Sequence, residues 1–158
     1  MNKIKLKNRF ASIWFPQLPL ETILSKEPLL DGLPIVVSFS DGEEIICTNE
    51  LAKKLNIHPG MSTKETLTLN PHVVSKTVQH SDIKKKLINL FRFTYQFTPL
   101  IRLDSYDSLM LDITGCEKFT GKEEDFIDQL KTHFSKINIL SVVGIAGTQG
   151  AAWAVARF

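Results

Sequence analysis

The sequence predicts an α+β fold in which a smaller lobe is inserted into a sheet covered by helices. The chain has 158 residues, 43% hydrophobic and 23% charged, which is enough for a domain with a substantial core. Short β-branched and aromatic runs alternate with helical segments in the order β-α-ββ-αα-β-α-ββ-α-β-α, without repeats or low-complexity linkers. From this order we expect residues 22–79 to form the inserted lobe and residues 8–21 and 80–158 to form the main one.

The first strand is predicted at residues 9–15, RFASIWF, because this run is short, aromatic and β-branched. Pro16 and Pro19 end the strand and favour the first turn of a following helix. Two further strands, LPIVVSFS and EEIICTN, flank Asp41 and Gly42. Since glycine tolerates the positive φ of a tight turn, this arrangement predicts an antiparallel hairpin.

Two short helices and a strand complete the predicted insertion. Asn49 is suited to cap a helix with the sequence ELAKKLN, because its side chain can accept a hydrogen bond from a free backbone N–H. The breaker HPGM separates this helix from a second one at residues 63–69, which Asn70 and Pro71 end. The run HVVSKTV then predicts a strand at residues 72–78.

The longest helix is predicted to follow Ser81, which can cap it. Residues suited to packing recur every three or four positions and form one continuous stripe: Ile83, Leu87, Leu90, Phe91, Thr94 and Phe97. The runs LIRLDS and SLMLDIT predict a second hairpin, with Tyr106 and Asp107 at its turn.

The end of the chain continues the alternation of helix and strand. An amphipathic helix is predicted at residues 122–137. The run NILSVVGIAG at residues 138–147 is almost entirely apolar, which is typical of a central strand covered on both faces. A final helix begins near Thr148 and is still uncapped at Phe158, so we expect the chain to be a fragment or a truncated product.

Composition narrows the function classes only slightly. The formal net charge of +2 neither demands nor excludes a polyanionic partner, so an argument for nucleic acid must rest on local features. Cys47 and Cys116 match no zinc or CxxC spacing and are expected to be core thiols, and Trp14 and Trp153 are expected to be buried anchors. No segment approaches the roughly 20 apolar residues of a membrane span, so we expect a cytoplasmic protein without a membrane partner.

Three carboxylates crowd the second hairpin. Asp104, Asp107 and Asp112 lie within nine positions of the segment RLDSYDSLMLDITG. Carboxylates this close repel one another, so they either share a cation such as Mg²⁺ or are directed apart by strands and turns. Asp112 belongs to LDITG, where turn formation is the stronger interpretation.

Three segments resemble the Y-family (UmuC/DinB-like) DNA polymerases. ASIWFPQLPLE resembles the first palm strand and helix, CTNELAKKLNIHPGMS the fingers motif, and SYDSLMLDITG the second palm motif. A fourth segment, GIAGTQGAAWAVARF, is similar to the strand and helix that follow in the family. The resemblance covers residues 9–158. It implies a polymerase-type palm, a mixed or antiparallel sheet with helices on one face, formed by residues 8–21 and 80–158. Residues 22–79 then correspond to a small α+β fingers lobe.

The resemblance also implies a metal site, which this sequence retains only in part. Active members of the family hold two Mg²⁺ with an Asp on the first palm strand and an adjacent Asp-Glu pair in the second motif. Here Asp107 matches the Asp of the pair, but Ser108 replaces the Glu and Ser12 stands at the first-strand position. Because Mg²⁺ binding depends mainly on ligand charge, we expect no intact catalytic centre, no metal and no cofactor, with Asp107 the one remaining candidate ligand.

The fingers motif implies where DNA or a nucleotide would lie. The family directs a Tyr and an Arg toward the incoming triphosphate; Glu50 stands at the Tyr position, whereas Lys53 keeps the positive charge. The Lys of the family's last helix has no match either. The candidate residues for weak electrostatic contacts with DNA or nucleotide are Lys53, Lys54, His58 and Lys64.

Such losses resemble the ImuB-type branch of the family, whose members bind DNA and recruit partners. The resemblance therefore implies a non-catalytic adaptor in DNA repair and SOS-type, damage-induced translesion mutagenesis, which binds primer-template DNA weakly through its phosphates. It also implies a replicative-type partner polymerase and a sliding clamp, contacted through a thumb, little finger and tail expected beyond Phe158. Two alternatives stay open: an active error-prone polymerase that uses Asp107 and Mg²⁺ with a carboxylate such as Asp104, and a palm-like protein-interaction scaffold.

Overall fold

The computed structural model describes residues 7–158, which form two compact units. Among the described residues, one unit contains residues 7–16 together with residues 87–158, and the other is Gln17–Lys86. The second unit extends a few residues beyond both ends of the lobe suggested by the sequence, residues 22–79. The assignment of these ranges to palm and fingers domains stays a prediction. The mixed α+β fold class itself is confirmed.

A four-stranded sheet forms the centre of the first unit. Its strands are β1 (Phe10–Trp14), β5 (Ile101–Ser105), β6 (Ser108–Asp112) and β7 (Val142–Ala146). They lie in the order β5-β6-β1-β7, and every neighbouring pair is antiparallel. Ser12 of β1 lies opposite Met110 of β6 and Gly144 of β7. Residues that are opposite in register point to the same face, so these three positions share one face of the sheet.

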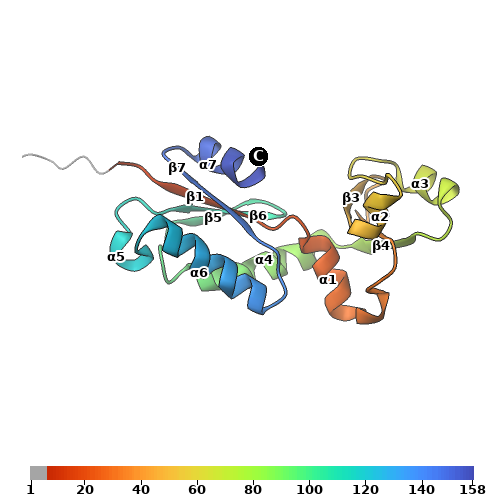
Figure 1. Cartoon of the computed structure of the whole chain (residues 1–158), viewed down its shortest axis with the longest axis horizontal. Helices are drawn as coiled ribbons and strands as arrows, with labels where there is room; N and C mark the ends of the chain where they lie inside the picture. The colour runs from red at the N-terminus through yellow and green to blue at the C-terminus, as the bar shows by residue number, and fades with distance from the viewer. Residues whose placement is uncertain (1–6) are drawn as a thin grey trace, which may run out of the picture. The chain divides into compact units, whose positions relative to one another are not determined.

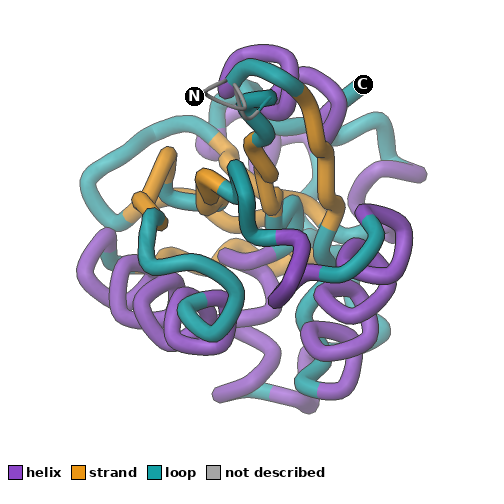
Figure 2. Tube along the Cα trace, turned by 90° about the vertical axis from the view of Figure 1, so that its left-hand side faces the viewer, coloured by secondary structure: helices purple, strands orange, loops and turns teal. Residues whose placement is uncertain are grey.

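Helices cover both faces of this sheet (Figures 1 and 2). On one face lie α6 (Glu123–Lys136) and the second half of α4 (His80–Thr94), as expected for the palm. There the Phe15 ring meets Phe134 edge-on at a centroid distance of 5.1 Å, and Phe97 meets Phe126 at 4.9 Å. On the opposite face lies α7 (Gln149–Arg157), so the expectation that helices cover one face alone is wrong in this detail.

The prediction of a central strand at residues 138–147 is wrong in both position and length. The strand begins only at Val142 and forms the edge of the sheet. Asn138 has a positive φ of 57°, a turn conformation that asparagine tolerates better than most residues, and the chain is not yet extended there. The strand is apolar at an edge because α7 packs along it.

Gly144 allows α7 to approach β7 very closely. A Cβ atom at Gly144 would lie 2.4 Å from the backbone nitrogen of Ala156 and 2.5 Å from the carbonyl oxygen of Ala152. Ala152 and Ala156 are 0% and 2% exposed, so small residues on both sides let the helix backbone rest on the strand. This packing fixes the place of Arg157, which follows Ala156 directly.

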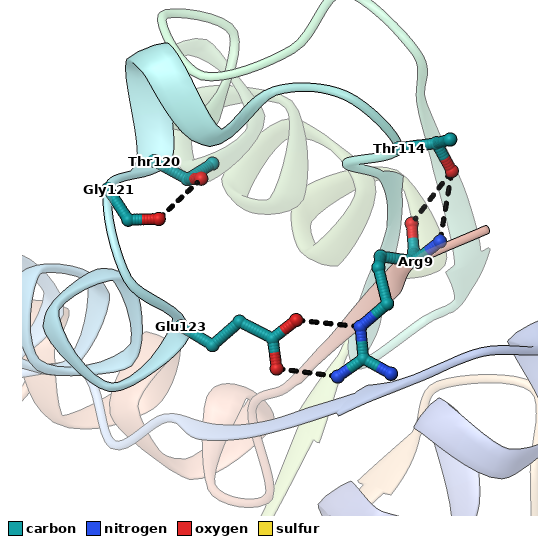
Figure 3. A network of polar contacts seen from close by, with 5 residues as sticks. All are labelled: Arg9, Thr114, Thr120, Gly121 and Glu123. Atoms are coloured by element: carbon teal, nitrogen blue, oxygen red, sulfur yellow. Dashed lines mark hydrogen bonds and ion pairs between the residues drawn. The ribbon is translucent and has the colours of Figure 1, made fainter. Parts of the chain in front are cut away.

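Arg9 joins β1 to two later segments of the chain (Figure 3). Its guanidinium donates to both carboxylate oxygens of Glu123, the first residue of α6, at 2.6 and 2.5 Å. Its backbone N–H donates to Thr114 Oγ1 at 2.9 Å. The hydrogen bond from Arg9 lowers the pKa of the Glu123 carboxyl. The negative charge of Glu123 is also favourable at the N-terminus of a helix, where the helix dipole is positive. The pair thereby fixes where α6 begins relative to β1.

The second unit contains a three-stranded sheet in the order β3-β2-β4. Its strands are β2 (Ile35–Phe39), β3 (Ile45–Thr48) and β4 (Val74–Val78), and β2 pairs antiparallel with β3 and parallel with β4. The predicted hairpin at Asp41 and Gly42 is confirmed. The other elements are α1 (Leu18–Lys26), a 3-10 turn (Pro28–Leu30), α2 (Glu50–Lys54) and α3 (Thr63–Leu69). A small core lies among them: Val36, Ile45, Ala52, Ile57 and Val73.

The predicted cap at Asn49 is confirmed. Its Oδ1 accepts hydrogen bonds from the N–H groups of Ala52 and Ile35, both at 3.0 Å, and its Nδ2 donates to the carbonyl oxygen of Leu33 at 2.6 Å. One side chain therefore both caps α2 and ties it to β2. The lysines of α2 are positioned through this link.

The sequence missed two short elements, the 3-10 turn and α5 (Glu117–Thr120). Each is about one helical turn, which is too short to show a period. Within residues 7–158, no helix combines the length and apolar character needed to span a bilayer.

Candidate functional site

Asp107 lies at the turn between β5 and β6, beside the end of β1. Its backbone carbonyl accepts from the Phe15 N–H at 2.8 Å, and its Oδ2 accepts from the indole Nε1 of Trp14 at 2.8 Å. Trp14 is opposite Ser108 in the β1–β6 register, so strand pairing brings the indole next to the turn. The Asp107 side chain is 17% exposed.

Arg157, at the end of α7, brings a positive charge to this carboxylate. Its Nη2 lies 3.7 Å from Asp107 Oδ1 and donates to Ser108 Oγ at 3.2 Å. Its Cζ lies 4.4 Å from the ring centroid of Trp153 and 5.3 Å from that of Trp14. The side chain is 11% exposed, so the guanidinium is held among two indoles, a hydroxyl and a carboxylate. We call these five residues the Arg157 cluster.

The two positions that the resemblance predicts to be lost metal ligands carry neutral hydroxyls. Ser12 is fully buried on the face covered by α7, and its Oγ has no hydrogen-bond partner within the described part of the chain. Ser108 is also fully buried, and its hydroxyl accepts from Arg157. Neutral hydroxyls do not supply the charge that Mg²⁺ requires, and a guanidinium beside Asp107 repels a dication.

The other two carboxylates of the hairpin are occupied elsewhere. Asp104 pairs with Arg102 through an Oδ1–Nη2 distance of 2.8 Å. Asp112 Oδ1 accepts from the Thr114 N–H at 3.0 Å, which is a local turn contact. Among residues 7–158, no group of three His, Cys, Asp or Glu side chains is placed to hold a metal ion. The residues present therefore do not fit a two-metal centre.

The candidate DNA-facing residues lie in the second unit. Lys53 and Lys54 are on α2, His58 is in the loop that follows, and Lys64 is in the first turn of α3. All of these side chains are exposed except that of Lys53, which is half-buried. Lys53 Nζ lies 2.7 Å from Glu50 Oε1, and this hydrogen bond lowers the pKa of the Glu50 carboxyl. Glu50 thus pairs with Lys53, the cation that the resemblance directs toward a nucleotide.

A family model described as the impB/mucB/samB family matches residues 13–157. The chain belongs to this family. Protein ImuB of Caulobacter vibrioides is 31% identical over 104 residues, which cover 66% of this chain and 23% of that protein. DNA polymerase IV of Serratia proteamaculans is 28% identical over 123 residues, which cover 76% of this chain and 35% of that protein. The resemblance seen in the sequence is confirmed.

Solved Y-family structures share the fold. A structure described as the insertion ternary complex of Dbh DNA polymerase superposes with a TM-score of 0.76 at 20% identity, covering 94% of this chain and 45% of that one. DinB from Sulfolobus solfataricus gives a TM-score of 0.75 at 21% identity, with the same coverage of both chains. This likeness shows that the fold is the palm and fingers of these polymerases. The chain spans less than half the length of these relatives.

Sequence reasoning did not find Arg157 or the role of Trp14. The prediction of a buried anchor is wrong for Trp153, which is 38% exposed and lies against Arg157. Two signals were available. Trp14 follows Ser12 by two residues and so lies on the same strand face, and Arg157 follows Trp153 by four residues and so lies on the same helix face.

Proposed function

We propose that this protein is a non-catalytic, Y-family polymerase-like protein that binds primer-template DNA and acts as an adaptor for a partner polymerase. It would act in DNA repair and damage-induced translesion mutagenesis. One observation supports the proposal: Asp107, which the resemblance places at the family's metal site, accepts a hydrogen bond from Trp14 and forms an ion pair with Arg157. The other two ligand positions are the buried hydroxyls of Ser12 and Ser108.

The absence of catalysis follows from the chemistry of phosphoryl transfer. Two metal ions are needed to activate the attacking hydroxyl and to stabilise the charge of the triphosphate and the leaving group. A guanidinium beside Asp107 supplies positive charge. Unlike a metal ion, it cannot coordinate the attacking hydroxyl or the oxygen of the leaving group. We therefore expect no nucleotide addition and no metal or cofactor requirement.

The DNA-binding part of the proposal rests on exposed cations and on the relatives. Lys54, His58 and Lys64 are exposed on the second unit, where lysine–phosphate contacts give affinity that is independent of sequence and sensitive to salt. The related proteins include DNA polymerases and ImuB. Because Glu50 pairs with Lys53, we expect contacts with the duplex backbone rather than with an incoming nucleotide.

The partners are proposed from the likeness to ImuB. We expect the partners to be a replicative-type polymerase and a sliding clamp. They would bind mainly through regions that are found in the relatives and that this chain does not span. The same likeness supports a role in SOS-type mutagenesis.

An active DNA-directed polymerase is the second candidate, because the chain also resembles DNA polymerase IV and keeps Asp107. It would need Mg²⁺ and a second carboxylate, and the nearest in sequence, Asp104, is paired with Arg102. Primer extension separates the candidates: Mg²⁺-dependent extension that is lost in Asp107→Ala would establish the polymerase and overturn the adaptor.

DNA binding is tested by fluorescence anisotropy of a labelled primer-template across a salt series. The adaptor is expected to bind with a negative slope of log K against log salt, and Lys54→Ala or Lys64→Ala should each reduce that slope by about 0.9. Lys131→Ala, an exposed lysine on α6, is the matched control and should leave the slope unchanged. A protein-interaction scaffold would show no binding at any salt concentration.

A further inference from the structure

In the Arg157 cluster, the positive charge beside Asp107 is supplied by the protein's own side chain. The guanidinium Nη2 serves both Asp107 and Ser108, and Nη1 donates to the carbonyl oxygen of Trp153 at 3.4 Å. Its Cζ lies over the indole rings of Trp14 and Trp153. Each of these contacts comes from a different part of the chain: β1, the β5–β6 turn, β6 and α7.

The backbone holds Arg157 in this place. The contact of α7 with Gly144 leaves no room for the helix to move toward β7, because a single added Cβ would already lie 2.4 Å from Ala156. Arg157 is the next residue along the same helix. The packing of α7 therefore fixes the backbone at Arg157, and the contacts with Ser108, Trp14 and Trp153 hold the guanidinium beside Asp107.

We propose that Arg157 is a fixed counter-ion for Asp107 that excludes a divalent cation, so that restoring the two missing carboxylates does not by itself restore a metal site. The inference rests on the proposed function, since it treats Asp107 as a former metal ligand. It goes beyond that function by naming the residue that keeps the site closed.

The position of Ser108 explains why a restored carboxylate would not be free. Its Oγ is already 3.2 Å from Arg157 Nη2, so the Glu of Ser108→Glu would meet the same guanidinium as Asp107 does. Both carboxylates would then share one cation in charge-assisted hydrogen bonds. Mg²⁺ requires oxygen ligands at about 2.0–2.1 Å and loses its hydration water reluctantly, so it competes poorly with a cation already in place.

The position of Ser12 adds to the same effect. It is fully buried on the α7 face, and an Asp there would be removed from water. Burial disfavours the charged form of a carboxyl unless a cation is near. Arg157 lies on the same face of the sheet, where it contacts Ser108 and Trp14, so we expect the carboxylate of Ser12→Asp to be attracted to this guanidinium rather than to a metal.

The test compares Mn²⁺ binding, followed by the EPR signal of free Mn²⁺, in matched variants of the chain. Ser12→Asp with Ser108→Glu is expected to bind no more Mn²⁺ than the wild type. Adding Arg157→Gln should raise the affinity at least about tenfold, which corresponds to about 1.4 kcal/mol. Adding Arg102→Gln instead removes a positive charge from the same sheet without touching the cluster and should have no effect.

Two results would overturn the inference: strong Mn²⁺ binding by the doubly restored variant that keeps Arg157, or no gain when Arg157→Gln is added to a folded variant. If Ser12→Asp prevents folding, Ser108→Glu with and without Arg157→Gln gives the same comparison. In the same restored background, Arg157→Lys keeps the positive charge and should leave Mn²⁺ binding at the wild-type level. A failure of the proposed function would appear separately, as absent binding of primer-template DNA by the wild type.

Discussion

Breaking the pair between Asp107 and Arg157 should destabilise the first unit by an amount that a double-mutant cycle can measure. At the observed 3.7 Å and an effective dielectric constant of about 20, the gross attraction is about 4.5 kcal/mol. The cost of removing both groups from water offsets most of it, and a net coupling of about 1–1.5 kcal/mol remains for side chains that are 11% and 17% exposed.

The single variants should each cost more than this coupling. Arg157→Gln also weakens the contacts with the indoles of Trp14 and Trp153, so we expect a loss of about 2 kcal/mol in the free energy of unfolding. Asp107→Asn keeps an acceptor for the Trp14 N–H and should cost about 1.5 kcal/mol. The double variant should then lose about 2.3 kcal/mol, clearly less than the sum of the single losses.

Urea unfolding, followed by tryptophan fluorescence and circular dichroism, measures the cycle. The matched control is Arg102→Gln with Asp104→Asn, a closer pair at 2.8 Å in which Arg102 is 56% exposed. Solvent screening should limit its coupling to about 0.5 kcal/mol or less. A coupling near zero for Asp107 and Arg157, or one no larger than the control, would refute the reasoning.

Three further outcomes are expected. Glu50→Gln should free Lys53 and steepen the salt dependence of DNA binding by about 0.9 in anisotropy titrations, and an unchanged slope would contradict the neutralising role of Glu50. Gly144→Ala should cost about 3 kcal/mol or more in urea unfolding because its Cβ meets the α7 backbone, whereas Gly150→Ala, with nothing within 4 Å, should stabilise the helix by about 0.5–1 kcal/mol. Burial raises the pKa of the Cys47 thiol from 9.0 to about 11, so its neutral form stabilises the folded state below pH 9 and this stability is lost as the pH rises toward 11. The loss should be roughly 2–3 kcal/mol and should be missing in Cys47→Ala; equal pH profiles for both proteins would exclude it.

Most of the fold could be read from the sequence because local signals agreed with tertiary packing. The Asn49 cap, the Asp41-Gly42 turn and the period of α4 each depend on neighbours close in the chain. The edge position of β7 could not be predicted in this way. An edge strand covered by a helix is as apolar as a central one, and only the contact of α7 with Gly144 distinguishes them.

The candidate site was predictable where it follows a motif and not where it depends on distant pairing. The SYDSLMLDITG motif predicts Asp107 as a retained ligand position and Ser108 as a lost one, and this stays a prediction. Arg157 lies 50 positions after Asp107, in a segment to which the resemblance assigned no role for this residue. Its role depends on how close α7 lies to the sheet, which the small residues at 144, 152 and 156 determine together.

The Mg²⁺ dependence of DNA binding distinguishes a palm that holds Arg157 beside Asp107 from a palm that holds a metal ion there. Anisotropy of a labelled primer-template is measured in Mg²⁺ and in EDTA at equal ionic strength, for the wild type and for Asp107→Ala. We expect salt-dependent binding with the same affinity in all four conditions, because the palm holds Arg157 rather than a metal beside Asp107. Binding that is strengthened by Mg²⁺ in the wild type and loses this gain in Asp107→Ala would contradict this expectation.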